Sequence, residues 1–394
     1  MAERVALTQD EDVHRTSQHH PAGQPFSLRR LGVIMEPEPG NPLEEEGVLN
    51  PAAARGPDGH LYLFPRIVAK GNYSRIGIAR VLFNGEGNPE GVERLGVILE
   101  PEADYERRPG GGGGCEDPRI SFVAPLNRYI MTYTAFGPRG PRIALAASHD
   151  LIHWERLGLA TFDPCDGSEC SVLDFTGVDN KDASIFPVLV PDPKGRPSLA
   201  MLHRPLFKGT DAADTVHHPT PRQVDVPRES IWISYCPRDG ENGTRLGHFR
   251  EHHRLAGPVA PWERLKVGGG APPFLTRDGW VFLYHGVKGE PPVPGQPRRL
   301  RYSAGVMVLD RHDPRFLLYR SAKPILVPES QEELQGTVAN VIFPTGTDVR
   351  TDWPQGHRVD VYYGMADSRI GVATLDLPGE LPPGALKDPH EGKV

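Results

Sequence analysis

The segment LGVIMEPE at residues 31–38 returns almost unchanged as LGVILEPE at residues 95–102, 64 residues further along the chain. Weaker copies are WERLG, which ends at Gly158, WERLKVG, which contains Leu265, and KPILVPE at residues 323–329. The wider gap between the third and fourth copies predicts an insertion of about 45 residues in that unit. Five copies of one segment predict a fold built from repeated units.

Two further series of segments recur once in each unit of this repeat. Each unit has a short segment that begins polar and turns apolar, and then two runs rich in β-branched and aromatic residues. In the first unit these runs are HLYLFPRIV and YSRIGIARVLF, and in the last they are RVDVYYGMA and SRIGVATLDL. Four strands per unit and five units predict an all-β, five-bladed β-propeller.

The first copy of the repeat precedes the first inner strand and has no unit of its own. We therefore predict that residues 28–36 supply the outer strand of the fifth blade and close the ring, which protects unpaired strand edges. The expected divisions are an N-terminal arm (1–27), a propeller catalytic domain (28–376) and a C-terminal tail (377–394). Two stacked β-domains are the alternative, but they give the five-fold phasing no role.

Composition excludes several classes of protein. The 394 residues carry a net charge of −7, so no basic stripe is available to bind nucleic acid. No apolar run reaches 18 residues, and the polar N-terminus lacks the apolar region of a secretory leader, so we expect neither a membrane span nor a signal peptide. The four cysteines have neither disulfide-framework nor zinc-site spacing, which favours a cytoplasmic protein without a metal site.

Polar residues stand where the inner strands of a propeller would begin. Those strands converge on the axis, so their first residues would line a central funnel. These positions hold Asn50, Asp117, Lys181, Asp182 and Asn340, and neighbouring strand ends add Arg204, His285 and Asp367. Such a mixture of cations and carboxylates suits a polar, partly anionic ligand.

Each of these residues also has a structural interpretation. The segment Glu116-Asp117-Pro118-Arg119 is compatible with a strand-entry turn that contains its own ion pair. Arg204 is equally compatible with a charge satisfied by backbone carbonyls or by Asp182. From the pattern alone, both alternatives stay open.

Longer motifs then carry a resemblance. The chain resembles glycoside hydrolase family 130, the mannoside phosphorylases and their hydrolytic relatives, over nearly all of its length beyond residue 40. The matching segments are LNPAA (49–53), NYSRIGIA (72–79), EDPRI (116–120), YIMTYTAFGPRGPRIALAAS (129–148), NKDASIFP (180–187), MLHRP (201–205), KVGGGAPPFLTRDGWVFLYHGV (266–287), YSAGVMVLD (302–310), DPRFLLYRSAKPIL (313–326), NVIFPTG (340–346) and VYYGMAD (361–367). The resemblance also implies a five-bladed propeller.

The resemblance implies inverting phosphorolysis of β-mannosides with release of α-mannose 1-phosphate. The substrates would be β-1,4- or β-1,2-linked manno-oligosaccharides, or mannosyl-glucose or mannosyl-N-acetylglucosamine. The implied proton donor is Asp117, the implied phosphate ligands are Lys181, Arg204 and His285, and the implied sugar-binding residues are Asn50, Arg66, Arg75, Asp182 and Asp367, with Arg66 the weaker candidate. Phosphate is already nucleophilic, so the site needs cations to hold it and no second carboxylate.

Two other functions remain to be weighed. A β-mannosidase of the same family would use water, and a carboxylate acting as base would replace the cations. A non-catalytic propeller would bind mannosides without turning them over. The expected partners are the mannoside and inorganic phosphate as co-substrate, with no other cofactor, no metal, no nucleic acid and no membrane; a homo-oligomer is left open.

Overall fold

The computed structural model describes residues 25–163, 175, 177–206, 229–238, 246–290, 299–351, 353 and 358–381. Most of the expected N-terminal arm, the end of the C-terminal tail and the segment that contains Cys165 and Cys170 lie outside the described residues. The fold is all-β, as predicted. The described helices are single turns: η1 (Ala124–Leu126), η3 (Pro261–Glu263) and α1 (Gln331–Leu334).

The strands form four sheets. One contains β2 (Gly47–Arg55), β3 (Leu61–Ala69), β4 (Tyr73–Phe83), β5 (Pro89–Leu99), β6 (Gly113–Val123), β7 (Arg128–Gly137), β8 (Gly140–Ser148) and β9 (Glu155–Leu159). The second contains β10 (Thr161–Phe162), β11 (Asp179–Pro191), β12 (Pro197–Leu206), β13 (Ile231–Pro237) and β14 (His248–Ala256). The third contains β15 (Lys266–Gly269), β16 (Phe274–Thr276), β17 (Gly279–Gly289), β18 (Leu300–Leu309) and β19 (Leu317–Arg320), and the fourth β20 (Ile342–Arg350), β21 (Arg358–Met365), β22 (Arg369–Asp376) and β1 (Ser27–Met35).

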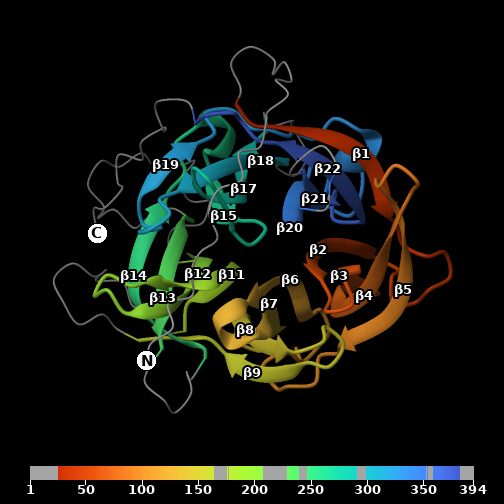
Figure 1. Cartoon of the computed structure of the whole chain (residues 1–394). Coiled ribbons are helices and arrows are strands. Elements are labelled where there is room, and N and C mark those ends of the chain that lie inside the picture. The colour runs from red at the N-terminus through yellow and green to blue at the C-terminus, as the bar shows by residue number, and fades with distance from the viewer. Residues whose placement is uncertain are drawn as a thin grey trace.

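Neighbouring strands within the sheets are mostly antiparallel and consecutive in sequence. In the largest sheet, β4 and β6 meet only through a short parallel contact, Tyr73 with Gly113 and Ser74 with Gly114. That contact divides the sheet into two antiparallel sets, β2–β5 and β6–β9. Figure 1 shows the sheets arranged around a centre, with β2, β6, β11, β15 and β20 nearest to it.

The strands nearest the centre share a local irregularity. Asn50, Asp117 and Asp182 have φ values of 45°, 47° and 55°, in the left-handed region that Asn and Asp tolerate better than most residues. At each of them the pairing to the next strand shifts, between Leu49 and Ala52 in β2, for example. In the third sheet the ladder is interrupted between β15 and β16 instead. Three of the residues predicted to line the centre, Asn50, Asp117 and Asp182, therefore sit at breaks in their own strands.

The repeated segment follows the outer strands, with one exception. LGVIMEPE lies largely in β1, LGVILEPE in β5 and WERLG in β9, and Ile325 and Leu326 of KPILVPE bond to Ala304 on the outer side of β18. The exception is WERLKVG, the fourth copy of the repeat, which spans η3 and β15 and so begins the third sheet. Its tryptophan, Trp262, is buried against Gly286 and Gly305, where a Cβ would meet the indole ring at 2.4 and 2.7 Å.

Apolar side chains from neighbouring sheets share cores. One core joins Ile130 and Leu145 of β7 and β8 with Ile185 and Leu199 of β11 and β12, all with 2% exposure or less. Faces of adjacent sheets thus pack on each other, and burial of this apolar surface is the main stabilising contribution. No helix among the described residues is long and apolar enough to cross a membrane.

The N-terminal strand β1 pairs antiparallel with β22 at the other end of the chain, from Ser27 opposite Asp376 to Met35 opposite Ile370. Arg30 fixes this strand to the turn that holds α1. Its guanidinium donates to both carboxylate oxygens of Glu333, at 2.8 and 2.9 Å, and to the carbonyl of Val327 at 2.6 Å. Because the Glu333 carboxylate is fully buried, Arg30 supplies its neutralising charge.

We predict that Arg30→Ala lowers the free energy of unfolding by about 3 kcal/mol, since it leaves a buried carboxylate without its cation. The matched control is Arg29→Ala, an exposed neighbour on the same strand, which should change stability by less than about 0.5 kcal/mol. Urea unfolding followed by tryptophan fluorescence measures both variants. Equal midpoints for the two would contradict the role given to Arg30.

Candidate active site

Asp117 lies at the break in β6 and is held by two side chains from neighbouring strands. Asn50 Nδ2 donates to Asp117 Oδ1 at 2.9 Å, and Arg66 Nη1 lies 3.3 Å from the same oxygen. The Asp117 side chain is 13% exposed, so it is largely buried among these neighbours. The structural alternative, an ion pair within Glu116-Asp117-Pro118-Arg119, does not form. Arg119 donates instead to the backbone carbonyl of Asp117.

Arg66 is the cation at the centre of this group. Its guanidinium donates to Glu116 Oε1 at 2.9 Å, to Asn72 Oδ1 at 3.1 Å and to Ser74 Oγ at 2.9 Å, besides its contact with Asp117. The residue considered the weaker sugar-binding candidate is therefore in direct contact with the expected acid. Each of these partners comes from a different turn or strand, which holds the guanidinium in one orientation.

Arg75 lies apart from this group. Its Nε donates to both oxygens of Glu100, at 2.8 and 2.7 Å, and its guanidinium stacks on Tyr73 at 4.5 Å from the ring centre. Its Nη1 is buried and has no hydrogen-bond partner among the described residues. That nitrogen is a donor left for a ligand, although Arg75 does not touch Asp117 in the described structure.

The central carboxyl groups differ in their affinity for protons. Burial raises the pKa of Asp117, but Arg66, Arg119 and the bond from Asn50 outweigh burial and leave the pKa below its ordinary value. Burial raises the pKa of Asp367 to about 6, because the nearby carboxylates Asp117 and Glu116 offset the opposing effect of Arg66. The pKa of Asp367 is therefore raised, whereas that of Asp117 is lowered.

A second charged group surrounds Asp182, at the break in β11. Arg204 Nε donates to Asp182 Oδ2 at 2.6 Å, and His285 Nε2 lies 3.6 Å from the same oxygen. Arg204 also forms an ion pair through Nη1 with the buried Glu229, whose carboxylate lies 3.9 Å from Lys266 Nζ. The structure thus brings Arg204 and His285 together, but Arg204 is neutralised by two carboxylates.

His285 contributes a neutral imidazole to this group. The side chain is fully buried, and burial lowers the pKa of His285 to about 3, with the cations Arg204, Lys266 and Arg119 adding to the effect against the pull of Asp182. Neither ring nitrogen has a hydrogen-bond partner among the described residues. The three expected phosphate ligands are therefore not all cations, because His285 offers a hydrogen bond rather than a charge.

Lys181 lies between the two groups. It is the cross-strand partner of Arg204, and its Nζ lies 5.5 Å from the centre of the Phe136 ring. Its charge also lowers the pKa values of Asp117 and Asp367. Arg119 also belongs to this region, because it donates to the backbone carbonyl of Asp117. Its Nε donates to Gly270 O at 2.7 Å, and its Nη2 is buried without a hydrogen-bond partner among the described residues.

Two glycines make room for these contacts. A Cβ on Gly268 would lie 2.2 Å from Asp182 Oδ2 and 2.4 Å from His285 Cε1. A Cβ on Gly364 would lie 2.0 Å from Asn50 Oδ1. Any other residue at either position would push a central side chain out of place.

Sequence reasoning missed Glu229, Lys266 and Arg119 as members of the site. Arg119 could have been found, since it belongs to the EDPRI segment. Glu229 follows an insertion without any motif, so no sequence signal pointed to it. Lys266 begins the KVGGGAPPFLTRDGWVFLYHGV segment (266–287) but was given no role. Among the described residues no three His, Cys, Asp or Glu side chains come together in a way that could hold a metal ion.

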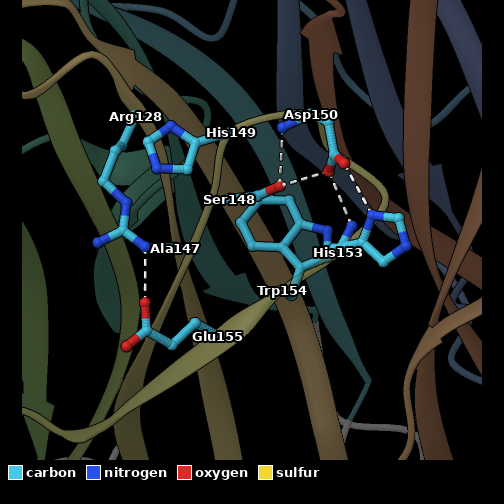
Figure 2. Close-up of a pocket in the computed structure, with 8 residues that line it drawn as sticks. All are labelled: Arg128, Ala147, Ser148, His149, Asp150, His153, Trp154 and Glu155. Atoms are coloured by element: carbon cyan, nitrogen blue, oxygen red, sulfur yellow. Dashed lines mark hydrogen bonds and ion pairs between the residues drawn. The ribbon is translucent and has the colours of Figure 1, made fainter.

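The hollow shown in Figure 2 is separate from this site. It measures about 350 Å³ and is lined by Arg128, Ala147, Ser148, His149, Asp150, His153, Trp154 and Glu155. Its walls come from the ends of β7, β8 and β9 that are remote from the chain segment around Asp117. Arg128 pairs with Glu155 and His153 with Asp150, so its charged groups satisfy each other rather than await a ligand.

Comparisons with known proteins bear on this geometry. A family model described as β-1,4-mannooligosaccharide phosphorylase matches residues 28–379. A 1,2-β-oligomannan phosphorylase from Thermoanaerobacter sp. (strain X514) is 31% identical over 361 residues, which cover 89% of this chain and 98% of that protein. A β-1,4-mannooligosaccharide phosphorylase from Ruminococcus albus is 29% identical over 65% of this chain and 61% of its own.

A solved structure has the same fold. The complex of β-1,2-mannobiose phosphorylase from Listeria innocua with β-1,2-mannobiose matches with a TM-score of 0.63 and 22% identity, over 90% of this chain and 96% of that one. The family model spans both charged groups and the strands that carry them, and the Thermoanaerobacter protein is matched over almost its whole length. The chain therefore belongs to glycoside hydrolase family 130.

Proposed function

We propose that this chain is an inverting β-mannoside phosphorylase, which cleaves β-1,2- or β-1,4-linked mannosides with inorganic phosphate and releases α-mannose 1-phosphate. One observation carries the proposal: a largely buried carboxyl group, Asp117, is flanked by cations, Arg66 and Lys181 among them. Relatives that match over most of this chain are mannoside phosphorylases. A phosphate that enters this site would meet these cations.

The reaction assigns one role to each part of the site. A phosphate oxygen attacks the anomeric carbon of the mannosyl unit, and the bond from that carbon to the glycosidic oxygen breaks. Asp117 gives its proton to the departing oxygen, directly or through a sugar hydroxyl. In this proposal Lys181, Arg204 and His285 hold phosphate, and Asn50, Arg66, Arg75, Asp182 and Asp367 position the sugar or the residues around it.

Proton supply depends on phosphate. The pKa of Asp117 is lowered, chiefly by Arg66 against the effect of burial, so the carboxyl group holds no proton at neutral pH. A bound phosphate anion neutralises the cations and raises the pKa of Asp117, since a nearby negative charge disfavours the carboxylate. Phosphate would therefore act both as nucleophile and as the group that prepares the acid.

Glu229 favours one second candidate function. An inverting hydrolase needs a carboxylate to activate water, and Glu229 is a buried carboxylate within the group that would hold phosphate. A β-mannosidase that uses Glu229 as base is therefore the alternative reaction. The retained Lys181, Arg204 and His285 support phosphorolysis, because hydrolysis has no need of them.

We also propose the finer features of the fold and setting. Five antiparallel sets of strands around one centre, with β2 against β6 and β20 and β6 against β11, support a five-bladed propeller in which β1 completes the last blade. Phosphate enters as co-substrate, and the proposed steps call for no metal or organic cofactor. A cytoplasmic location and self-association remain proposals from the sequence.

The proposal predicts strict phosphate dependence. Purified protein incubated with β-1,2- or β-1,4-mannobiose should release α-mannose 1-phosphate only when inorganic phosphate is present. Asp117→Asn should lower kcat by at least about a hundredfold, since general acid catalysis contributes that much or more, while mannobiose binding measured by calorimetry persists. Mannose released at the same rate without phosphate would instead indicate the hydrolase.

The raised pKa of Asp367 predicts that the free energy of unfolding changes with pH. Its folded-state pKa of about 6 exceeds the unfolded value of about 4, so its stabilising contribution is complete below about pH 4 and is lost as pH rises through 6. Asn cannot ionise, so Asp367→Asn should gain stability relative to the natural protein as pH rises from 4.5 to 7. Urea unfolding at several pH values measures this, and a difference that does not change with pH would contradict it.

Glu229→Gln separates the two candidate reactions. For a phosphorylase, removing the negative charge beside Arg204 should lower the KM for phosphate, because an entering phosphate no longer meets a carboxylate. For a hydrolase, the same variant should abolish phosphate-independent release of mannose. Glu155→Gln, which breaks an ion pair in the hollow of Figure 2, is the control and should change neither quantity.

A further inference from the structure

A continuous chain of hydrogen bonds crosses the second sheet from β11 to the end of β10. His203 Nδ1 lies 3.0 Å from Asn180 Nδ2, and His203 Nε2 lies 2.7 Å from Ser234 Oγ. Ser234 Oγ lies 2.8 Å from His252 Nδ1, and His252 Nε2 lies 2.9 Å from the backbone oxygen of Asp163. We call these residues the His203 chain. Strands β11, β12, β13 and β14 each supply one of its side chains.

The His203 chain is shielded from water. Its four side chains are at most 4% exposed, and burial lowers the pKa values of His203 and His252, so both imidazoles are neutral. The Phe162 ring lies 4.9 Å from that of His203, and the Phe175 ring lies 4.5 Å from that of His252. In such surroundings a hydrogen bond is strong and an unpaired polar group is costly.

The outer end of the His203 chain, at the carbonyl of Asp163, sets the direction of every hydrogen bond in it. A carbonyl oxygen only accepts, so His252 Nε2 donates to Asp163 and its Nδ1 must accept from the Ser234 hydroxyl. Ser234, having given its proton outward, accepts from His203 Nε2. The neutral His203 then has only a lone pair at Nδ1, which accepts from Asn180 Nδ2 at 3.0 Å, while Asn180 Oδ1 lies 3.2 Å from the same nitrogen. This arrangement pairs both imidazoles and the Ser234 hydroxyl.

The inner end of the chain adjoins the proposed phosphate ligands. Asn180 directly precedes Lys181, and His203 directly precedes Arg204. Lys181 and Arg204 are cross-strand partners of each other. Neighbouring side chains in a strand point to opposite faces, so His203 is anchored on one face of β12 while Arg204 reaches Asp182 from the other.

We propose that the His203 chain is a positioning device that fixes the Lys181–Arg204 pair and so sets the affinity for inorganic phosphate. The inference rests on the proposed function, since it assigns these two residues to phosphate. Its members touch no substrate and act only through the strands β11 and β12. A buried hydrogen-bond network with both imidazoles and the hydroxyl paired specifies one geometry where apolar packing would allow several.

Ser234→Ala tests the inference, because it removes the one group that both donates and accepts in the middle of the chain. The KM for phosphate should rise by about tenfold, the lower end of what loss of an outer hydrogen bond costs at ligand sites. The KM for mannobiose and kcat at saturating phosphate should stay within about twofold, since only phosphate positioning is lost. Ser234→Thr keeps the hydroxyl and should restore the phosphate KM.

Ser198→Ala is the matched control. Ser198 is a fully buried serine of β12 in the same sheet, and its hydroxyl donates to the carbonyl of Arg196 at 2.9 Å. It is not a member of the His203 chain. It should leave both KM values unchanged. If Ser234→Ala yields too little folded protein, His252→Asn replaces it, because this variant keeps an acceptor for Ser234 and loses the bond to Asp163; a smaller rise in phosphate KM is then expected.

The outcomes separate this inference from the proposed function. An unchanged phosphate KM in Ser234→Ala, or equal rises in both KM values, would overturn the positioning role while phosphorolysis stands. A natural protein whose mannobiose cleavage ignores phosphate would overturn both. A selective rise that Ser234→Thr reverses and Ser198→Ala does not reproduce supports the inference.

Discussion

The left-handed backbone at the breaks of the central strands is the constraint on which the site depends. At Asn50, Asp117 and Asp182 the strand interrupts its pairing and turns a short polar side chain out of the regular alternation. Asn and Asp adopt this conformation at smaller cost than larger residues, and the sheets around them supply the compensating bonds. Three breaks in three neighbouring sets of strands bring these side chains within reach of cations from the next strands.

Charge balance organises everything around those breaks. Buried ions must be paired, and the pairs here are Arg66 with Glu116 and Asp117, and Arg204 with Asp182 and Glu229. In the proposed reaction, an entering phosphate would exchange some of these pairs for its own. That exchange would link phosphate binding to the protonation of Asp117, and it would make Glu229 the carboxylate that competes with phosphate for Arg204.

Support for the charged groups extends one layer outward. Gly268 and Gly364 leave the space that Asp182, His285 and Asn50 occupy, and the His203 chain anchors the opposite face of the strands that carry Lys181 and Arg204. These groups do no chemistry themselves. They restrict the positions of those that do, which is how a site made of long, flexible cationic side chains becomes precise.

The amino-acid sequence by itself determined the strands, their repeated order and the polar residues at the centre, because strand propensity and the tolerance of Asn and Asp for left-handed backbone are local properties. The WERLKVG segment matches the repeat in sequence, but the other copies lie at outer strands whereas its Trp262 packs at the start of the next sheet. Only the tertiary structure decided that Arg66 meets Asp117, that Glu229 meets Arg204, and that His285 is neutral. Those outcomes depend on distances between side chains that lie dozens of residues apart and on the burial that packing creates, and neither quantity is written in any local pattern.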